Sequence, residues 1–203
     1  MAELIREIIL TKINKSDLSY HPVTPDRWKD FELLFGKRGA CGGCWCMNWR
    51  LMKAQFEFQK GDQNKKAMKS RIKKGSVPGV IACYNSDPIG WCSIEPRENF
   101  PRLALARTLK PIDDKPVWSI SCLFIAKDYR KQNIAAALVK ASVKYAKSQN
   151  ANIVEAYPYD LTGKDEQLPD PFVWTGLVQI FIEAGFKEAA RFSKTRPIMR
   201  KNI

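Results

Sequence analysis

The chain has 203 residues, of which 45% are hydrophobic and 27% charged, and its 34 lysines and arginines outnumber 21 acidic residues, giving a formal net charge of +13. This composition is typical of a globular protein with one mixed domain and excludes collagenous and disordered chains. No apolar stretch approaches the ~20 residues of a membrane-spanning helix, and Glu3, Arg6 and Glu7 interrupt the place of a signal peptide. We therefore expect a cytoplasmic protein without membrane contact, whose six cysteines are reduced.

The amino-terminal third predicts one strand followed by helices. Residues 7–13 are rich in β-branched side chains, which favour a strand. Thr24-Pro25-Asp26 is typical of a helix start, and Gly36 ends that helix. The other elements predicted here are a loop over 39–46 and helices over 48–58 and 62–74.

The strongest strand pattern covers residues 117–125, which are apolar on both faces and therefore predicted to be central in a sheet. A β-hairpin over 80–84 and 89–94 precedes it, and an amphipathic helix follows Asp128-Tyr129. The remaining elements are a strand over 152–159, a polar loop over 161–171, a short helix marked by 177–184 and one or two closing strands over 186–200. Without a repeat or a long linker, this order predicts a single domain, 1–203, built on a mixed α/β sheet.

The positive charge is concentrated in residues 37–74, which hold eleven basic residues against Glu57 and Asp62. Such a segment attracts polyanions, and one hypothesis is a nucleic-acid-binding module. The alternative is a solvated helix face. Residues 62–74 contain no aromatic side chains on which bases could stack, so we expect no nucleic-acid partner.

Residues 128–135, Asp-Tyr-Arg-Lys-Gln-Asn-Ile-Ala, join the central strand to the amphipathic helix. Backbone N–H groups at a helix start and the positive end of the helix dipole bind anions, and Arg130 and Lys131 add charge. The chain contains neither Gly-x-x-x-x-Gly-Lys nor Gly-x-Gly-x-x-Gly, so neither a nucleotide triphosphatase nor a Rossmann site is supported.

This turn resembles the acyl-CoA pyrophosphate loop of the GNAT superfamily of N-acyltransferases, whose pattern is Arg or Gln, two residues, Gly, one residue, then Gly or Ala. Arg130, Asn133 and Ala135 fill those positions, with Asn in place of Gly. Asn tolerates unusual backbone angles best among the non-glycine residues. The preceding strand and the Phe-Ile-Glu-Ala-Gly-Phe run at 181–186 extend the likeness over residues 78–201.

The resemblance implies a mixed, mostly antiparallel central sheet flanked by helices and an N-acetyltransferase that uses acetyl-CoA, without a metal. Its acceptor would be a primary amine of a small molecule or peptide, and the family allows a homodimer. The acetyl-CoA site would comprise Leu123, Phe124 and Ile125 for the pantetheine arm and thioester, and Arg130, Lys131, Gln132, Asn133, Ile134 and Ala135 for the pyrophosphate. A protein of this fold that binds CoA without catalysis is an alternative.

The amino-terminal part resembles a GNAT subgroup with a Cys-Gly-Gly-Cys-Trp-Cys-Met stretch followed by Trp-Arg, here Cys41 to Arg50, together with the run at 90–97. In the family, the region before the first hairpin covers the acceptor pocket, so residues 1–77 would form the acceptor side and 78–203 the CoA-binding core. The expected acceptor-binding residues are Cys44, Trp45, Trp49 and Trp91. Burial in the core is the alternative for these tryptophans, above all Trp91.

Cys41, Cys44 and Cys46 lie within six residues but do not predict a metal or thioredoxin-like site. Structural zinc takes four ligands, and no second Cys or His pair accompanies the three cysteines. The element predicted before them is a helix rather than the strand of a thioredoxin-like dithiol. His21, the single histidine, has no companions of a hydrolytic triad and is expected on the surface.

For catalysis, Glu95 at the end of the hairpin is the candidate general base, and its alternative is an exposed loop carboxylate. The family's usual general acid is a Tyr at the position held here by Phe181. Either the thiolate leaves without a dedicated acid, or a tyrosine at the end of the preceding strand replaces it. Tyr157 and Tyr159 are the two candidates, and we assign the role to Tyr159.

Overall fold

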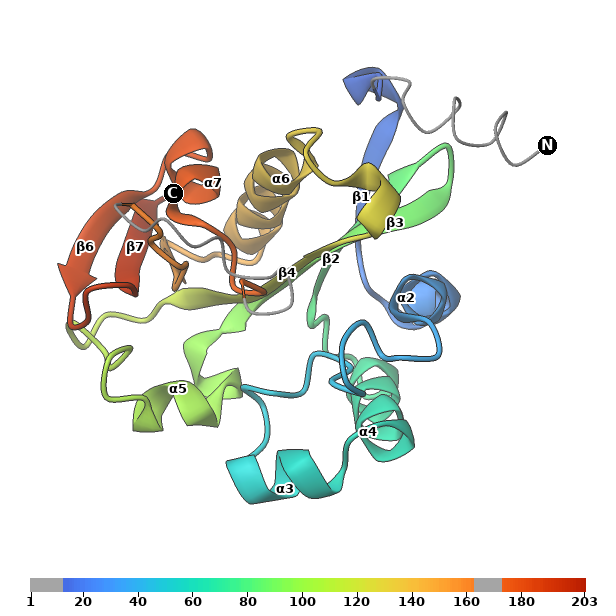
Figure 1. Ribbon diagram of the computed structural model, residues 1–203, viewed down its shortest axis with the longest axis horizontal. Helices are drawn as coiled ribbons and strands as arrows, with labels where there is room; N and C mark the ends of the chain where they lie inside the picture. The colour runs from blue at the N-terminus through green and yellow to red at the C-terminus, as the bar shows by residue number, and fades with distance from the viewer. Residues whose placement is uncertain (1–12, 163–172) are drawn as a thin grey trace.

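The computed structural model describes residues 13–162 and 173–203, and its described part centres on one twisted seven-stranded sheet (Figure 1). The order across the sheet is β1-β2-β3-β4-β5-β7-β6, and within the described residues only β4 and β5 pair in parallel. The strands are β1 (Leu18–Pro22), β2 (Gly79–Tyr84), β3 (Asp87–Pro96), β4 (Trp118–Ile125), β5 (Ile153–Ala156), β6 (Lys187–Arg191) and β7 (Pro197–Asn202). This mixed, mostly antiparallel sheet confirms the predicted fold class.

The helices cover the two faces of the sheet unequally (Figure 1). On one face lie α6 (Ile134–Ser148) and α7 (Val178–Glu183), packed over the largest core cluster. The other face carries α2 (Trp28–Phe35), α3 (Lys53–Phe58), α4 (Asp62–Lys73) and α5 (Pro101–Leu105), over two smaller clusters. The short 3₁₀ helices are η1 (Lys15–Asp17), η2 (Pro25–Arg27), η3 (Arg97–Asn99) and η4 (Lys127–Tyr129). No helix in 13–162 or 173–203 is long and apolar enough to span a membrane.

The prediction of a central strand over 117–125 and of a hairpin before it is confirmed by β4, β2 and β3. The strand expected at 7–13 lies outside the described residues except for Ile13, which is not in a strand. The first described strand is instead β1, an edge strand whose Ser19, Tyr20 and His21 give little apolar alternation. Most of the predicted polar loop at 161–171 also lies outside the described residues.

Two predicted boundaries were wrong, and one short helix was not predicted. The helix expected over 48–58 begins only at Lys53, because residues 48–52 form turns that follow the cysteine-rich loop. The strand expected over 152–159 ends at Ala156, where its pairing with β4 also ends. The loop between the hairpin and β4 contains the short helix α5, which starts at Pro101 and buries Leu103.

The carboxyl-terminal half of β4 is the place where the sheet opens. β4 pairs with β5 only from Trp118 to Ile120. Farther along, the Leu123 backbone N–H donates instead to the Trp174 carbonyl at 2.7 Å. On its β5 side the end of β4 therefore lies beside an irregular segment, while its other edge stays paired with β3.

Candidate functional site

The turn from β4 into α6 has an unusual backbone. Lys131 and Asn133 both have positive φ, 60° and 57°, and Asn133 is the left-handed N-cap of α6 with ψ of 21°. Glycine adopts this conformation freely and Asn is the non-glycine residue that tolerates it best, which explains Asn at the glycine position of the loop pattern. The Asn133 side chain makes no capping hydrogen bond, so the first N–H groups of the 15-residue helix are left to other acceptors.

Side chains of the turn hold its shape. The Arg130 Nε donates to the Ile125 carbonyl at 2.9 Å, and the Gln132 Oε1 accepts from the Ile13 backbone N–H at 3.1 Å. Ile134 is buried and anchors the first turn of α6, whereas Lys131 and Asn133 are exposed. The turn therefore presents backbone N–H groups and the Lys131 charge to solvent at the positive end of a long helix, the arrangement that binds anions.

A pocket of about 250 Å³ lies where β4 meets the cysteine-rich loop, which we define as residues 39–48. Cys44, Leu123 and Phe124 line it, so the structure brings an expected acceptor residue together with two expected donor residues. Trp174 also lines this pocket, although no sequence pattern pointed to it. The other lining residues are Phe35, Ala40, Cys41, Gly42, Cys46, Asn48, Phe56, Lys60 and Cys122.

Trp45 and Trp91 do not line this pocket. Trp91 is fully buried and meets Phe31 edge-on at 4.9 Å between ring centroids, while Trp45 stacks on Phe35 at 5.6 Å. Both rings belong to the aromatic cluster between α2 and the sheet, where their large apolar surfaces are removed from water. Both side chains form the core behind the pocket wall, which is the alternative that the sequence offered for them.

Trp49 occupies an intermediate position. It is half-buried, its ring lies 5.8 Å from that of Trp174, and the Arg102 guanidinium packs over it at 5.5 Å. Trp174 lines the pocket and Trp49 does not, so Trp49 packs behind that part of the wall.

Glu95 is neither an exposed loop carboxylate nor a free base. Its side chain is buried, forms an ion pair with the buried Arg50, and accepts from Arg71 Nη2 at 3.2 Å and from Asn99 Nδ2 at 3.4 Å. Arg50 also donates to the Pro78 carbonyl and to the Ser93 hydroxyl, which fixes the residues after the cysteine-rich loop against β3. The alternative of an exposed loop carboxylate is therefore wrong, and the Glu95 oxygens are occupied by Arg50, Arg71 and Asn99.

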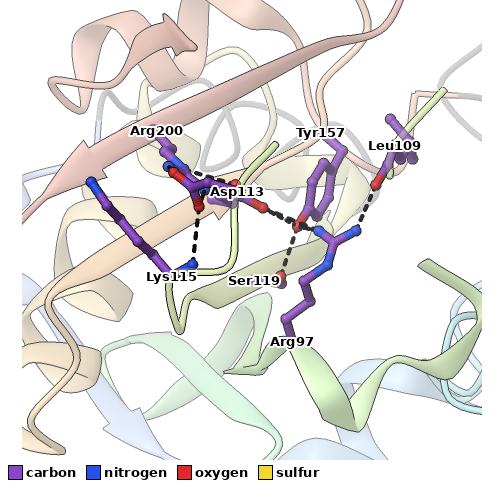
Figure 2. A network of polar contacts seen from close by, with 8 residues as sticks. Arg97, Leu109, Asp113, Lys115, Ser119, Tyr157 and Arg200 are labelled. Atoms are coloured by element: carbon purple, nitrogen blue, oxygen red, sulfur yellow. Dashed lines mark hydrogen bonds and ion pairs between the residues drawn. The ribbon is translucent and has the colours of Figure 1, made fainter. Parts of the chain in front are cut away.

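The two candidate tyrosines differ in their exposure to solvent. Tyr157 is fully buried, and its hydroxyl contacts Arg97, Ser119 and the Glu155 carboxylate, as Figure 2 shows for Arg97 and Ser119. Burial and the nearby Glu155 raise the pKa of Tyr157 well above its usual range, so its hydroxyl stays protonated. Tyr159 is partly exposed, and its ring packs against the Arg196 guanidinium at 4.2 Å.

A second hollow of about 390 Å³ lies at the other end of β4, between α5 and the β4–β5 edge. Arg200 bridges Glu155 and Asp113 there, with Nη–Oδ distances of 2.7 and 2.8 Å to Asp113 (Figure 2). Its walls mix acidic and basic side chains, and its charges are largely paired with one another. This hollow lies at the opposite end of β4 from the pocket and contains none of the predicted site residues.

The basic segment 37–74 is only partly a free surface. Arg50 and Arg71 bind Glu95, Lys65 pairs with Glu32, and Lys69 packs over the Trp28 ring at 5.2 Å. These contacts use several of the positive charges inside the domain. Among the described residues, no group of three or more His, Cys, Asp and Glu side chains could hold a metal ion.

Comparisons with known proteins bear on this geometry. In solved structures, the chain resembles a GNAT-family acetyltransferase from Streptococcus pneumoniae (13% identity, TM-score 0.50), covering 92% of this chain and 99% of that one. It also resembles aminoglycoside acetyltransferase AAC(6')-Ib in complex with coenzyme A (15%, 0.52; 91% and 94% covered). A third is ribosomal-protein-S5-alanine acetyltransferase from Vibrio fischeri (10%, 0.52; 94% and 95%). At these identities the likeness shows the fold.

No curated protein matches the chain. The model of the family described as "Acetyltransferase (GNAT) family" matches residues 45–161, which is more than half of the sequence and includes β4, the left-handed turn and α6. The chain therefore belongs to the acetyltransferase (GNAT) family.

Proposed function

We propose that this protein transfers an acetyl group from acetyl-CoA to a primary amine of a small molecule or peptide. One observation carries the proposal within the family assignment: Asn133 adopts the left-handed conformation at the position of the loop's glycine, at the start of a 15-residue helix. A phosphate-binding turn needs that conformation to aim consecutive N–H groups at one anion. Asn at this position therefore preserves the turn rather than marking its loss.

The donor would bind on the α6 side of β4. The backbone N–H groups of Gln132 to Ala135 would bind the pyrophosphate, with Lys131 adding positive charge. The pantetheine arm would lie along Leu123 to Ile125, whose edge lacks a β5 partner. The Leu123 N–H already donates to the Trp174 carbonyl, so the pantetheine arm would have to replace Trp174 as its acceptor. Because Trp174 lines the pocket, donor binding would then affect the pocket wall.

The acceptor would bind in the pocket lined by Cys44, Phe124 and Trp174. Its walls are apolar with few charges, which suits the neutral amine that must attack the thioester. A backbone N–H near Phe124 would polarise the thioester oxygen, and one such donor is typically worth ~10²–10³ in rate. The names of two similar structures, an aminoglycoside acetyltransferase and an acetyltransferase of a ribosomal-protein alanine, support an amine as acceptor.

Proton transfer is assigned to Tyr159 and to solvent. Tyr159 is the partly exposed member of the tyrosine pair and its backbone bonds to Gly176, two residues from Trp174. It would donate a proton to the leaving CoA thiolate. Because the Glu95 oxygens are occupied, we assign Glu95 the role of a positioning residue that holds Arg50, and with it the cysteine-rich loop, while the amine loses its proton to water.

The proposal is tested with the purified full chain in two steps. Acetyl-CoA or CoA at 100 times its dissociation constant should add ~2.7 kcal/mol of stability, seen as a melting temperature raised by several degrees. Acetyl transfer to panels of small amines, antibiotics and peptides should then be followed by chromatography of released CoA, because the exposed Cys41 would react with thiol reagents.

The two steps distinguish the alternatives. Stabilisation without transfer to any acceptor would favour a CoA-binding protein without catalysis. A melting temperature unmoved by millimolar acetyl-CoA would contradict the donor site. Tight, sequence-selective binding of DNA or RNA that survives physiological salt would instead favour the nucleic-acid hypothesis.

A further inference from the structure

Two cysteines from distant parts of the sequence meet in the wall of the pocket. Cys46, in the cysteine-rich loop, and Cys122, on β4, both line it, and Cys122 packs against the aromatic core cluster that contains Cys46. Cys46 is 5% exposed, whereas Cys122 is half-buried. No step of the proposed acetyl transfer uses either thiol.

The backbone places Cys46 under constraint. Trp45 and Cys46 have consecutive positive φ angles of 46° and 57°, a conformation that is costly for residues with large side chains. The buried Trp45 ring, stacked on Phe35, holds this bend in place. The bend turns the Cys46 sulfur toward β3 and β4, where it meets Trp91 and Cys122.

The surroundings of the Cys46 sulfur favour its thiolate form. The Trp91 Nε1–H donates to Cys46 Sγ at 3.2 Å. Arg50 is buried beside it, and its Nε has no hydrogen-bond partner among the described residues. The hydrogen bond from Cys122, together with the Arg50 charge, lowers the pKa of Cys46 to about 6.

The charge balance of the buried cluster agrees with a thiolate. Arg50 and Arg71 supply two positive charges, and Glu95 supplies one negative charge. The other thiols near Cys46 favour their protonated form: burial raises the pKa of Cys44 to about 11 and that of Cys92 to about 12, and hydrogen bonding to Cys46 together with burial raises the pKa of Cys122. Cys46 is therefore the member of the pair that ionises more readily.

From this juxtaposition we infer that Cys46 and Cys122 form a redox site at which hydrogen peroxide oxidises the two thiols to a disulfide. The Cys46 thiolate attacks a peroxide oxygen, so that an S–O bond forms, the O–O bond breaks and the leaving hydroxide is protonated to water. The Cys122 sulfur then attacks the Cys46 sulfur, an S–S bond forms, and the S–O bond breaks to release a second water. Two thiols are oxidised and one peroxide is reduced.

The site fits a reversible oxidation better than a permanent disulfide. A low-pKa cysteine next to a second cysteine is the usual arrangement of a redox-sensitive pair. The disulfide would tie the cysteine-rich loop to β4 and remove the thiolate from the pocket wall. An effect on acetyl transfer would rest on the proposed function, but the oxidation itself does not.

The test uses the full chain, folded and reduced, exposed to about one equivalent of hydrogen peroxide. Remaining thiols are then blocked with iodoacetamide, and the disulfides are mapped by peptide mass spectrometry. We expect a Cys46–Cys122 cross-link that dithiothreitol reverses. Cys44→Ser is the matched control, because it changes another thiol of the same pocket and should leave the cross-link intact.

A second variant separates the two roles. In Cys122→Ser, Cys46 should still react with peroxide, but it should accumulate as a sulfenic acid that dimedone traps. Oxidation confined to the exposed Cys41, or a disulfide that joins Cys46 to Cys41 or Cys44 instead, would overturn the inference. The mapping on the unmodified chain decides the question even if the Cys122→Ser variant does not fold.

Discussion

The turn between β4 and α6 and the pocket at the cysteine-rich loop meet at the end of β4, yet they are built in opposite ways. The turn is one continuous segment, and its function depends on backbone angles and N–H groups. The pocket is assembled from the end of α2, the loop at 39–48, α3, β4 and Trp174, and a buried ion pair fixes its loop. The turn can therefore tolerate side-chain substitutions that the pocket, which depends on contacts between distant segments, cannot.

The largest effect should come from the buried ion pair behind the pocket. Glu95→Gln leaves the Arg50 guanidinium buried without its charge partner and should cost about 3–5 kcal/mol of unfolding free energy, measured by urea denaturation. Glu98→Gln makes the same chemical change at an exposed neighbour and should cost almost nothing. A Glu95→Gln protein as stable as the parent but inactive would restore Glu95 as the general base.

At the turn, one substitution should affect stability and donor binding in opposite directions. Asn133→Asp preserves the shape of the N-cap residue and adds a negative charge, which stabilises a helix start but repels a pyrophosphate. We expect CoA affinity to fall about five- to tenfold, from ~1 kcal/mol of electrostatic free energy, while the melting temperature of the free protein does not fall.

Asn133→Gly is the companion variant, because glycine accepts the φ of 57° without adding charge. Calorimetry should find its CoA affinity close to that of the parent. Equal affinities for the Asp and Gly variants would mean that the turn is only a helix start.

A smaller, selective effect is expected in the pocket. Cys44→Ser replaces a thiol of the pocket wall by a more polar hydroxyl, so the Michaelis constant for the amine should rise, by on the order of tenfold or less, with little change for acetyl-CoA. Cys41→Ser, at the exposed rim, should change neither constant much. Steady-state kinetics with each substrate varied in turn measures both Michaelis constants. A change confined to the Michaelis constant for acetyl-CoA would contradict an acceptor site in this pocket.

The smallest effect should appear far from both regions, at Asp113. Hydrogen bonds from Arg200 lower the pKa of Asp113 to about 2, below the ordinary Asp value of the unfolded chain. The contribution of this carboxylate to stability is therefore present above about pH 4 and is lost as the pH falls toward 2. Asp113→Asn should lower the melting temperature slightly at pH 7, and the difference from the parent should vanish near pH 2. A difference that persists there would show that the charge is not responsible.

The sequence by itself determined the parts of this protein that depend on neighbouring residues. The apolar run over 117–125 predicted the central strand, and the hairpin before it was confirmed. The pattern Arg130, Asn133 and Ala135 predicted a turn that needs an unusual backbone at Asn133, which is what its φ of 57° shows. Helix starts, turns and central strands are encoded within about ten residues, so a linear pattern can reveal them.

The tertiary structure alone decided which side chains face the pocket. Trp45 and Trp91 are buried behind it, Trp174 lines it, and Glu95 is paired with Arg50 from a segment 45 residues away in sequence. The meeting of Cys46 and Cys122 in the pocket wall is also a product of folding, since nothing in the spacing of the six cysteines predicts it. Burial and charge pairing depend on contacts between residues far apart in the chain, so they are settled only when the α2–α5 layer packs onto the sheet.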